Sequence, residues 1–397
     1  MLANEPDYIS NIASRTSPAS RESRGRRPLA RREARRRHKM NISNLTFIVT
    51  DDCNFDCAYC FQEKGKKSIS DSIVETAIEF FYPFFQNEAL NRVSFYGGEP
   101  LLAYSQIKHA VLMLMEKNKR ENKNIRFSLT TNGMLLTGEM LEFFDRYRFE
   151  ITLSFDGLAQ ESGRKKGTID KMIALIKQVR GFRHIDFEIN SVFTPRTVVN
   201  LSGSLRFMIE PGGPDITFNL SSMEQWSPED FHTLKNELER LVDYLALYYK
   251  KTRKIPIRNF QGSGGRQGIF RCNAGSRHMA ISPEGNIWGC FLFHDYFKTR
   301  PGSPEYHDYS FGPLNRFIKD YKTRYPAVVA NYLDLRQELF RTPNRFCFLC
   351  PRLESCMICP LNAAYSSGSL GHITCNHCRL SSIQMDAVQQ FRHKIVR

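Results

Sequence analysis

The sequence predicts an α/β protein whose main part is a partial (β/α) barrel of six units. From Asn44 onward, short β-rich runs alternate with segments of helical hydrophobic period, and this alternation is typical of βαβ units with parallel strands. Hydrophobic residues make up 41% of the 397 residues and aromatic residues 12%, so the chain can bury a large core. Eight of the eleven cysteines follow residue 255, which indicates a second, smaller, cysteine-rich part.

Six runs have the β-branched and aromatic composition of strands. They are residues 45–50, 92–96, 125–130, 149–155, 185–193 and 215–221. A closed barrel of this type has eight strands. With six visible units, we expect a barrel that stays open.

Helices are expected between the strands, for example over residues 71–85 and 107–120. In the first, Ser72 stands three residues before Glu75, which predicts a capping box, and Pro83 should end or kink the helix. A long amphipathic helix is expected over 228–251, with Ser227 as its N-cap. The glycine-rich run 261–268 favours a loop that enters a new module. We therefore divide the chain into a tail (1–43), a barrel (44–255) and a cysteine-rich domain (256–397).

Charge is concentrated at the N-terminus. The net charge is +15, and residues 1–39, with eleven Lys or Arg and four Asp or Glu, carry +7 of it. Such a segment can bind RNA or an acidic partner through counterion release, and it loosely resembles an organelle transit peptide. Apolar periodicity begins only after Met40, so the alternatives are a disordered tail or initiation at Met40. We do not expect the tail to decide the function.

The chain has no run of 18 apolar residues and no apolar N-terminal signal segment. We therefore expect neither a membrane span nor secretion, and we expect a cytoplasmic protein. Eleven cysteines without a secretory signal favour reduced thiols or metal ligands over a disulfide framework.

Three cysteines follow the first expected strand: Cys53, Cys57 and Cys60, at C-x3-C-x2-C spacing. In parallel α/β barrels the chemistry lies at the C-terminal ends of the strands, and the triplet occupies the first such loop. Structural zinc needs four protein ligands. A tight triplet suits an iron–sulfur cluster better, with one iron left open to a small molecule. The alternative is three buried structural thiols.

The segment CNFDCAYC, with Tyr59 before its last cysteine, resembles the cluster motif of the radical S-adenosylmethionine (SAM) enzymes. The resemblance implies a [4Fe–4S] cluster on Cys53, Cys57 and Cys60 whose open iron is chelated by the amino and carboxylate groups of SAM. It also implies the activity: reductive cleavage of SAM to methionine and a 5′-deoxyadenosyl radical, which abstracts hydrogen from a substrate.

Three further segments follow expected strands and match the family's patterns: FYGGEP (95–100), TTNG (130–133) and LSFDG (153–157). The family's Gly-Gly-Glu-Pro motif meets the methionine amino group of SAM, since glycines admit close backbone and a carboxylate suits an ammonium. The alternative for these positions is an ordinary loop or turn. The resemblance thus assigns SAM binding to Tyr59, Gly97, Gly98, Glu99 and Ser154, and the SAM carboxylate to Arg164.

The C-terminal cysteines include a C-x2-C-x5-C-x2-C run, which is a strong metal signal, with zinc as the structural alternative. They are Cys272, Cys290, Cys347, Cys350, Cys356, Cys359, Cys375 and Cys378. The set resembles the SPASM domain of radical SAM enzymes that modify peptides and proteins, a group related to the anaerobic sulfatase-maturing enzymes.

This second resemblance implies two auxiliary [4Fe–4S] clusters. One would use Cys272, Cys290 and Cys359, and the other Cys347, Cys350, Cys356 and either Cys375 or Cys378. The sequence departs from the family pattern twice. Two residues rather than three separate Cys356 from Cys359, and Arg266 and Gln267 stand where some members place a fourth ligand of the first cluster. That cluster either keeps an open iron or is completed by Cys378.

The resemblance favours maturation of a ribosomally synthesised peptide or protein, by thioether, carbon–carbon or related bond formation. Sulfatase-maturing relatives carry an aspartate base directly after the G-x4-C cysteine, where this chain has Phe291, with Asp295 four residues further on. Formylglycine formation is therefore an alternative rather than the first choice, and no catalytic base is assigned.

Expected partners are the substrate and an electron donor such as ferredoxin or flavodoxin. A leader segment of the substrate would be recognised by a separate leader-binding protein, by the barrel mouth or by the basic tail. Two other activities compete with peptide maturation. A radical SAM enzyme for a small molecule shares the first three cysteines. A zinc-ribbon nucleic-acid-binding protein explains the charge and the C-terminal cysteines, but it leaves the motifs at the strand ends unexplained.

Overall fold

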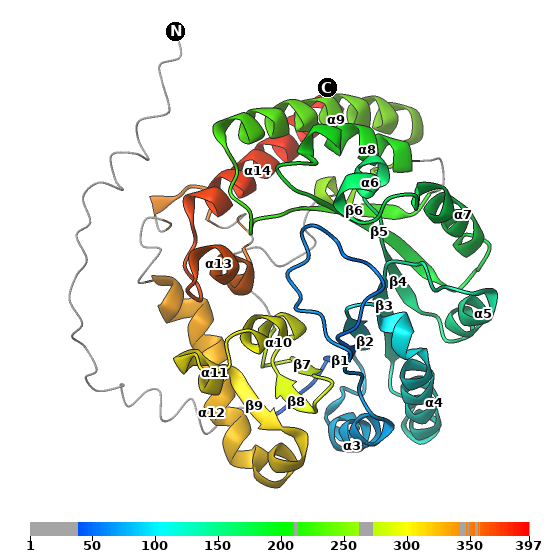
Figure 1. Cartoon of the computed structure of the whole chain (residues 1–397), viewed down its shortest axis with the longest axis vertical. Coiled ribbons are helices and arrows are strands. Elements are labelled where there is room, and N and C mark those ends of the chain that lie inside the picture. Colours follow the sequence, from blue (N-terminus) through cyan, green and yellow to red (C-terminus); the bar gives the residue numbers. More distant parts are fainter. Residues whose placement is uncertain are drawn as a thin grey trace. The chain divides into compact units, whose positions relative to one another are not determined.

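A computed structural model describes residues 39–209, 213–261, 273–341, 347, 349–353, 356 and 358–396. The described strands form one sheet in the order β6-β5-β4-β3-β2-β1-β7-β8-β9 (Figure 1). They are β1 (Asn44–Thr50), β2 (Asn91–Gly97), β3 (Ile125–Thr131), β4 (Glu150–Ser154), β5 (Asp186–Phe193), β6 (Asp215–Leu220), β7 (His278–Ile281), β8 (Asn286–Trp288) and β9 (Ser310–Pro313).

The helices of the first part are α3 (Asp71–Phe81), α4 (Tyr104–Glu121), α5 (Gly138–Arg146), α6 (Gln160–Gly163), α7 (Ile169–Val179), α8 (Leu201–Met208) and α9 (Pro228–Thr252). Those of the second part are α10 (Phe291–Lys298), α11 (Pro304–Tyr309), α12 (Leu314–Arg341), α13 (Pro360–Ser367) and α14 (Cys375–Val396). Short 3-10 turns η1 (Tyr82–Phe84), η2 (Pro100–Ala103), η3 (Gly157–Ala159), η4 (Val198–Asn200) and η5 (Arg258–Phe260) lie between them.

Strands β1 to β6 pair in parallel, each with the next along the chain. Helices α3, α4, α5 and α7 follow one another along the outer side of these strands (Figure 1). This arrangement confirms the predicted partial barrel of six βα units. Because all six parallel strands end at one edge, the loops after β1, β2, β3 and β4 gather there.

The face of the barrel that packs against the helices is apolar. Strand β2 buries alternate residues, and phenylalanines from neighbouring strands form a continuous row on this face. Phe95 lies between Phe47 and Phe149, at ring-centroid distances of 6.1 and 6.2 Å, and Phe127 lies 5.4 Å from Phe149. The aromatic content of the chain thus accounts for much of its core.

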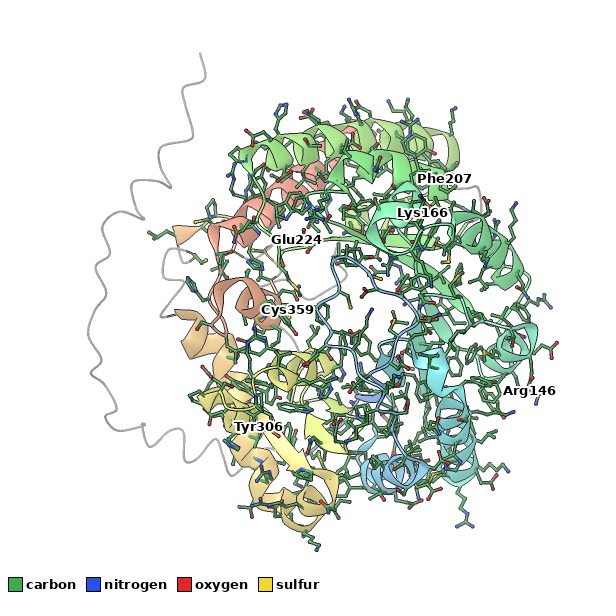
Figure 2. The ribbon with its side chains drawn as sticks, in the orientation of Figure 1. Arg146, Lys166, Phe207, Glu224, Tyr306 and Cys359 are labelled. Carbon is green, nitrogen blue, oxygen red and sulfur yellow. The ribbon has the colours of Figure 1, made fainter. Side chains whose placement is uncertain are left out.

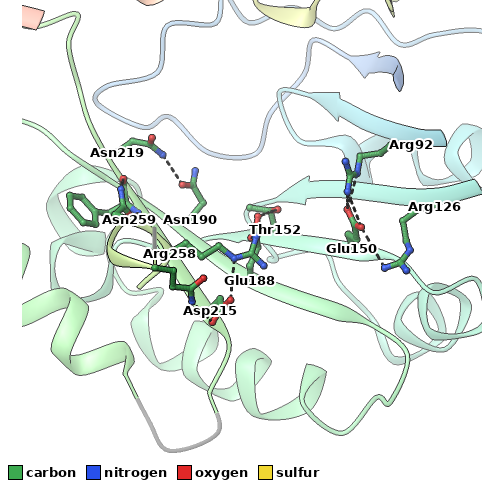
Figure 3. A network of polar contacts seen from close by, with 12 residues as sticks. Arg92, Arg126, Glu150, Thr152, Glu188, Asn190, Asp215, Asn219, Arg258 and Asn259 are labelled. Atoms are coloured by element: carbon green, nitrogen blue, oxygen red, sulfur yellow. Dashed lines mark hydrogen bonds and ion pairs between the residues drawn. The ribbon is translucent and has the colours of Figure 1, made fainter. Parts of the chain in front are cut away.

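The other face of the same strands is polar and half-buried (Figure 3). Glu150 accepts hydrogen bonds from Arg92 Nε at 2.8 Å and from Arg126 at 3.5 Å. Glu188 accepts one from Thr152 at 2.8 Å and pairs with Arg258 at 2.5 Å. A parallel sheet is usually apolar on both faces because helices cover both. This polar inner face is therefore suited to water or a polar ligand rather than to core packing.

Helix caps were predicted with mixed success. Ser227 is the N-cap of α9, as predicted. It also forms a complete capping box with Asp230. For α3 the prediction was wrong: the N-cap is Ser70, whose side chain accepts from the Ile73 amide, and Ser72 lies inside the helix. Helix α3 ends at Phe81, and Pro83 lies in the following turn η1.

The sheet continues into the C-terminal part. Strand β7 pairs in parallel with β1, and β8 and β9 extend the sheet in antiparallel fashion. Helix α14 packs along α9, where Tyr249 and Phe260 contact Phe391. Residues 39–397 form one compact unit. Strands on both sides of residue 255 belong to one sheet. The proposed domain boundary at this residue therefore stays a prediction.

None of the described helices has the length and apolar character that a membrane crossing needs. Residues 1–38 of the expected tail (1–43) lie outside the described residues, as do residues 262–268 of the glycine-rich run (261–268) and Cys272.

Candidate active site

The three-cysteine loop is the segment 51–67, which leaves the C-terminal end of β1 (blue in Figure 1). Cys53 and Cys57 are half-buried and Cys60 is exposed. The Cys60 amide donates to the Cys57 carbonyl at 3.1 Å, and the Ala58 amide donates to the Gly163 carbonyl at 3.0 Å. The loop therefore folds back over the barrel edge with its thiols partly accessible.

The three thiols lie within electrostatic range of one another. Burial raises the pKa of Cys57 to about 11; Arg164 opposes this shift, while Cys60 and Cys53 add to it. Burial is also the main cause of the raised pKa of Cys53, and Cys60 again contributes. Without a bound cation the Cys53 and Cys57 thiols stay protonated at neutral pH, and a metal would deprotonate them on binding.

Two glycines after β2 let the three-cysteine loop pack closely. Gly97 has φ +151°, and a Cβ there would lie 2.2 Å from the Thr50 carbonyl oxygen. A Cβ on Gly98 would lie 2.3 Å from the carbonyl oxygen of Asp52. Backbone hydrogen bonds close this contact, from Gly98 to Thr50 at 3.0 Å and from Glu99 to Asp52 at 2.8 Å. Only glycine permits this approach.

Glu99 is buried, with 1% of its surface exposed. Its carboxylate accepts from the Thr131 hydroxyl at 2.6 Å, the Asn132 amide at 2.8 Å and the Leu101 amide at 3.1 Å. Burial raises its pKa to about 7, against the lowering effect of these three donors. The side chain thus joins the loop after β2 to the loop after β3.

The next loop holds the three-cysteine loop from another side. Asn132, from the TTNG segment, donates to the Asn54 side chain at 2.7 Å. Lys165 donates to the Asn54 carbonyl at 3.1 Å and lies 5.0 Å from the Phe55 ring. The strand-end motifs that resemble the family therefore meet at one place.

Tyr59 and Arg164 share one carboxylate, Asp156. The Tyr59 hydroxyl donates to Asp156 at 2.6 Å, and Arg164 Nε lies 3.0 Å from the same oxygen. The other Asp156 oxygen accepts the Val192 amide at 2.8 Å. Arg164 also lies 5.3 Å from the Tyr59 ring. Asp156 is fully buried, so it fixes the positions of both side chains.

Ser154 is the last residue of β4, half-buried and in register with Asn190 of β5. It lies at the same barrel edge as Glu99 and Arg164.

On the opposite side, helix α10 faces the three-cysteine loop. Asp295 is 5% exposed and accepts a hydrogen bond from the Gln62 side chain at 3.3 Å. Burial raises the pKa of Asp295 to about 6; nearby His294 opposes the shift. Tyr96 lies within electrostatic range of Asp295 and of Cys60. A buried carboxylate therefore stands beside the thiol-bearing loop.

The C-terminal thiols gather in one group among the described residues. Burial raises the pKa of Cys347 to about 12, with contributions from Cys378, Cys356 and Cys350. Cys378 in turn interacts with Cys350, Cys356 and, less strongly, Cys375. The structure therefore brings Cys347, Cys350, Cys356 and Cys378 together, with Cys375 within electrostatic range of Cys378.

Two other C-terminal cysteines directly precede helices. Cys290 is the N-cap of α10, and Cys359, labelled in Figure 2, is the N-cap of α13. Both are half-buried. Tyr96 lies within electrostatic range of Cys290, and Tyr365 within range of Cys359. No disulfide joins any of the ten cysteines that the structure describes.

The donor chemistry of the two thiol groups, cysteine sulfur alone, is that of iron–sulfur clusters. In the described part of the chain, no three His, Cys, Asp or Glu side chains converge closely enough to hold one metal ion. In a [4Fe–4S] cluster each thiolate binds a different iron, so the thiols only need to surround a shared space. Both groups, the first three cysteines and the four near Cys347, consist of free thiols within electrostatic range of one another.

Sequence reasoning found the cysteines and the strand-end motifs but missed two contacts. Asp156 lay inside the quoted LSFDG segment without a role, although an acidic residue directly after a buried strand signals a site. The contact of α10 with the three-cysteine loop had no sequence signal, because its partners, Asp51 and Lys298, are about 250 residues apart along the chain.

The comparisons with known proteins agree with this geometry. Residues 47–195 match the family model of the Radical SAM superfamily. A cysteine-type anaerobic sulfatase-maturating enzyme of Clostridium perfringens is 27% identical over 289 residues, which cover 64% of this chain and 75% of that protein.

Two solved structures share the fold. Native anSMEcpe with bound AdoMet and Cp18Cys peptide has a TM-score of 0.67 and 18% identity, over 89% of this chain and 99% of that one. Streptococcus suis SuiB bound to precursor peptide SuiA has a TM-score of 0.57 and 17% identity, over 93% of this chain and 86% of that one. The three-cysteine loop, the parallel barrel and the match of the family model lead to one conclusion: residues 47–195 form a radical SAM domain.

Proposed function

We propose that this protein is a radical SAM maturase that abstracts hydrogen from a ribosomally synthesised peptide or protein. The observation that carries the proposal is the gathering of the Cys53, Cys57 and Cys60 thiols on one loop, braced by the loops after β2, β3 and β4. A [4Fe–4S] cluster on these thiols, with SAM at its open iron, would supply the 5′-deoxyadenosyl radical.

The residues around the loop divide the binding of SAM among them. Arg164 is the group for the SAM carboxylate, because a guanidinium binds a carboxylate strongly and with fixed geometry. Asp156 holds Arg164 and Tyr59 in place. The Glu99 side chain is engaged with the loop after β3, so the backbone from Gly97 to Glu99 meets the SAM amino group. Ser154 contributes from the end of β4.

We extend the proposal to the C-terminal cysteines, as a SPASM-like domain with two auxiliary [4Fe–4S] clusters. The mutual proximity of four thiols favours Cys347, Cys350, Cys356 and Cys378 as one ligand set. Cys378, rather than Cys375, is then its fourth ligand and is not available to the other cluster. Cys272, Cys290 and Cys359 remain for that cluster.

Asp295 is the carboxylate best placed to accept a substrate proton. When hydrogen abstraction is followed by loss of an electron to an oxidising centre, the substrate must also lose a proton. Asp295 stands beside Gln62 of the three-cysteine loop, and its pKa of about 6 suits a base near neutral pH.

Replacement of this carboxylate tests its role. Asp295→Asn should leave uncoupled cleavage of SAM intact and reduce product formation by about a hundredfold or more. Asp308→Asn, at an exposed residue of α11, is the matched control. Equal loss of uncoupled SAM cleavage in Asp295→Asn would assign the residue to folding instead.

The similar proteins support a peptide substrate, since SuiB is solved with a precursor peptide and anSMEcpe with a peptide. In this chain the residue after Cys290 is Phe291, whose ring lies 3.9 Å from that of Tyr96. An aromatic ring therefore stands directly after the cysteine, where the sulfatase-maturing enzymes carry their aspartate base. Formylglycine formation is the second candidate, because Asp295 lies one helical turn further along α10.

Deuterium transfer separates a peptide substrate from a small molecule. The reconstituted protein would receive SAM, dithionite and either the peptide or the small-molecule fraction of cells grown in deuterium oxide. We expect deuterium in 5′-deoxyadenosine only with the peptide fraction. Transfer from the small-molecule fraction alone would contradict the proposal, and an aldehyde on a cysteine-containing sulfatase peptide would establish the second candidate.

The proposal includes an electron donor of the ferredoxin or flavodoxin type and a cytoplasmic setting, where thiols stay reduced. It keeps the predicted boundary at residue 255 between the barrel and the cysteine-rich domain.

A further inference from the structure

Three consecutive residues after Cys60 are each held by the C-terminal part of the chain. The Phe61 ring lies 5.3 Å from the Tyr365 ring. The Gln62 side chain donates to Asp295 at 3.3 Å. The Glu63 carbonyl accepts from Lys298 at 2.9 Å. The segment that carries Cys60 therefore rests on helices α10 and α13 rather than on the barrel alone.

Lys298 also holds the other end of the same loop. Its Nζ lies 2.7 Å from Asp51 Oδ2, and His294 Nε2 lies 3.8 Å from Asp51 Oδ1. Asp51 is 9% exposed, so removal of Lys298 would leave a buried carboxylate without its ion-pair partner, which is costly. The Asp51 carbonyl in turn accepts the Gly65 amide at 3.1 Å. One lysine thus joins the start and the end of the three-cysteine loop.

Helices α10 and α13 pack on each other and form one support. The Tyr296 and Tyr365 rings meet edge to face at 5.2 Å, and the Arg300 guanidinium lies 4.2 Å from the Tyr296 ring and 5.8 Å from the Tyr365 ring. Each helix begins at a cysteine, Cys290 for α10 and Cys359 for α13. A group bound to both cysteines would therefore hold helices α10 and α13 in place relative to each other.

Simple core packing is the plainer explanation for these contacts. It accounts for the Phe61 contact. It does not account for the half-buried Lys298 or for the buried carboxylates Asp51 and Asp295, which are costly to bury and give a defined geometry instead. Their partners are residues of the loop that carries the thiols, on both sides of the cysteine triplet.

We propose that α10 and α13 position the three-cysteine loop, so that binding of iron–sulfur clusters at the C-terminal cysteines orders residues 61–67 and sets the place of Cys60. Lys298 is the main positioning residue, and Tyr365 assists it. The coupling to iron rests on the proposed function, whereas the support of the loop does not.

Amide hydrogen exchange of the metal-free protein tests the support. Lys298→Met should raise the exchange rate of Gly65 by roughly tenfold, because the Asp51 carbonyl that accepts its hydrogen bond loses its anchor. Lys298→Arg, which keeps the charge, should restore most of the protection. Lys394→Met is the matched control, since Lys394 pairs with Asp243 on the exposed surface. Unchanged exchange in Lys298→Met would overturn the proposal.

The coupling is tested in a variant with Cys53, Cys57 and Cys60 all changed to Ala, in which only C-terminal sites can take up iron. After anaerobic loading with iron and sulfide, we expect exchange over residues 61–67 to slow by roughly tenfold. Adding Lys298→Met should remove this effect at equal iron content. Iron uptake without a response of the loop would overturn the coupling alone. Absence of iron uptake would overturn the auxiliary clusters and, with them, the coupling.

Discussion

At the scale of single residues, the site depends on side chains that hold loops together. Glu99 is the clearest case, because a family resemblance assigns its carboxylate to SAM, whereas the structure engages it with Thr131, Asn132 and Leu101. A motif gives the spacing of residues along the chain. It does not give the partner that a buried side chain finds in the fold. For the same reason the sequence did not predict the role of Asp156, which contacts both Tyr59 and Arg164.

Glu99 should make stability depend on pH. Burial raises its pKa from 4.5 to about 7, so between these values the folded protein holds a proton that the unfolded chain has released. Stability is therefore lost as the pH rises through this window, by up to roughly 3 kcal/mol. Glu99→Gln should flatten the loss in urea denaturation of the metal-free protein.

The exposed Glu75, on α3, provides the control for this test: Glu75→Gln should keep the wild-type dependence on pH. If Glu99→Gln keeps it as well, another group is responsible.

Gly98 should tolerate no side chain. A Cβ there would meet the Asp52 carbonyl oxygen at 2.3 Å, and backbone cannot move aside cheaply. We expect Gly98→Ala to destabilise the protein by about 2 kcal/mol or more and to lower iron binding by the first three cysteines. Gly138→Ala is the control, because nothing lies within 4 Å of a Cβ there. Equal stability and iron content in both variants would contradict the close packing of this loop.

At the scale of elements, the sequence predicted the barrel strands correctly but not the residue at which helix α3 begins. All six barrel strands follow from runs of β-branched and aromatic residues, because burial of one sheet face requires that pattern. The start of α3 did not follow, since Ser70 and Ser72 both satisfy the sequence preference for an N-cap. In the structure Ser70 is the N-cap, because its backbone is extended and its side chain accepts a hydrogen bond from the Ile73 amide.

This choice predicts unequal effects for the two serines. Ser70→Ala should cost about 1 kcal/mol of unfolding free energy, because the Ile73 amide loses its capping bond. Ser72→Ala should cost less than half of that, since Ser72 lies within the helix. Urea denaturation of both variants gives the comparison. Equal costs, or a larger one for Ser72→Ala, would place the helix start at Ser72.

At the scale of the molecule, the two predicted parts share more than expected. Strand β7 joins the barrel sheet beside β1, and α10 and α13 hold the loop that follows β1. The sequence showed a change in composition near residue 255, which reflects cysteine content. It did not show pairing between strands that are more than 200 residues apart, because β7 is four residues long and carries little pattern.

For the C-terminal cysteines, too, spacing along the chain predicts the type of site but does not predict which thiols lie close together. Spacing predicted them as metal ligands, but it left Cys375 and Cys378 as equal choices. In helix α14 these residues are three apart, and Cys378 is the one near Cys347, Cys350 and Cys356. The choice follows from how α14 packs against the rest of the chain, which spacing alone does not contain.

The most direct test of the central claim is anaerobic reconstitution with iron and sulfide, followed by SAM and dithionite. The wild type would be compared with the variant in which Cys53, Cys57 and Cys60 are all Ala. We predict about 12 irons in the wild type and about 8 in the variant, with 5′-deoxyadenosine formed by the wild type alone. Zinc in place of iron, or SAM left intact by the wild type, would contradict the account.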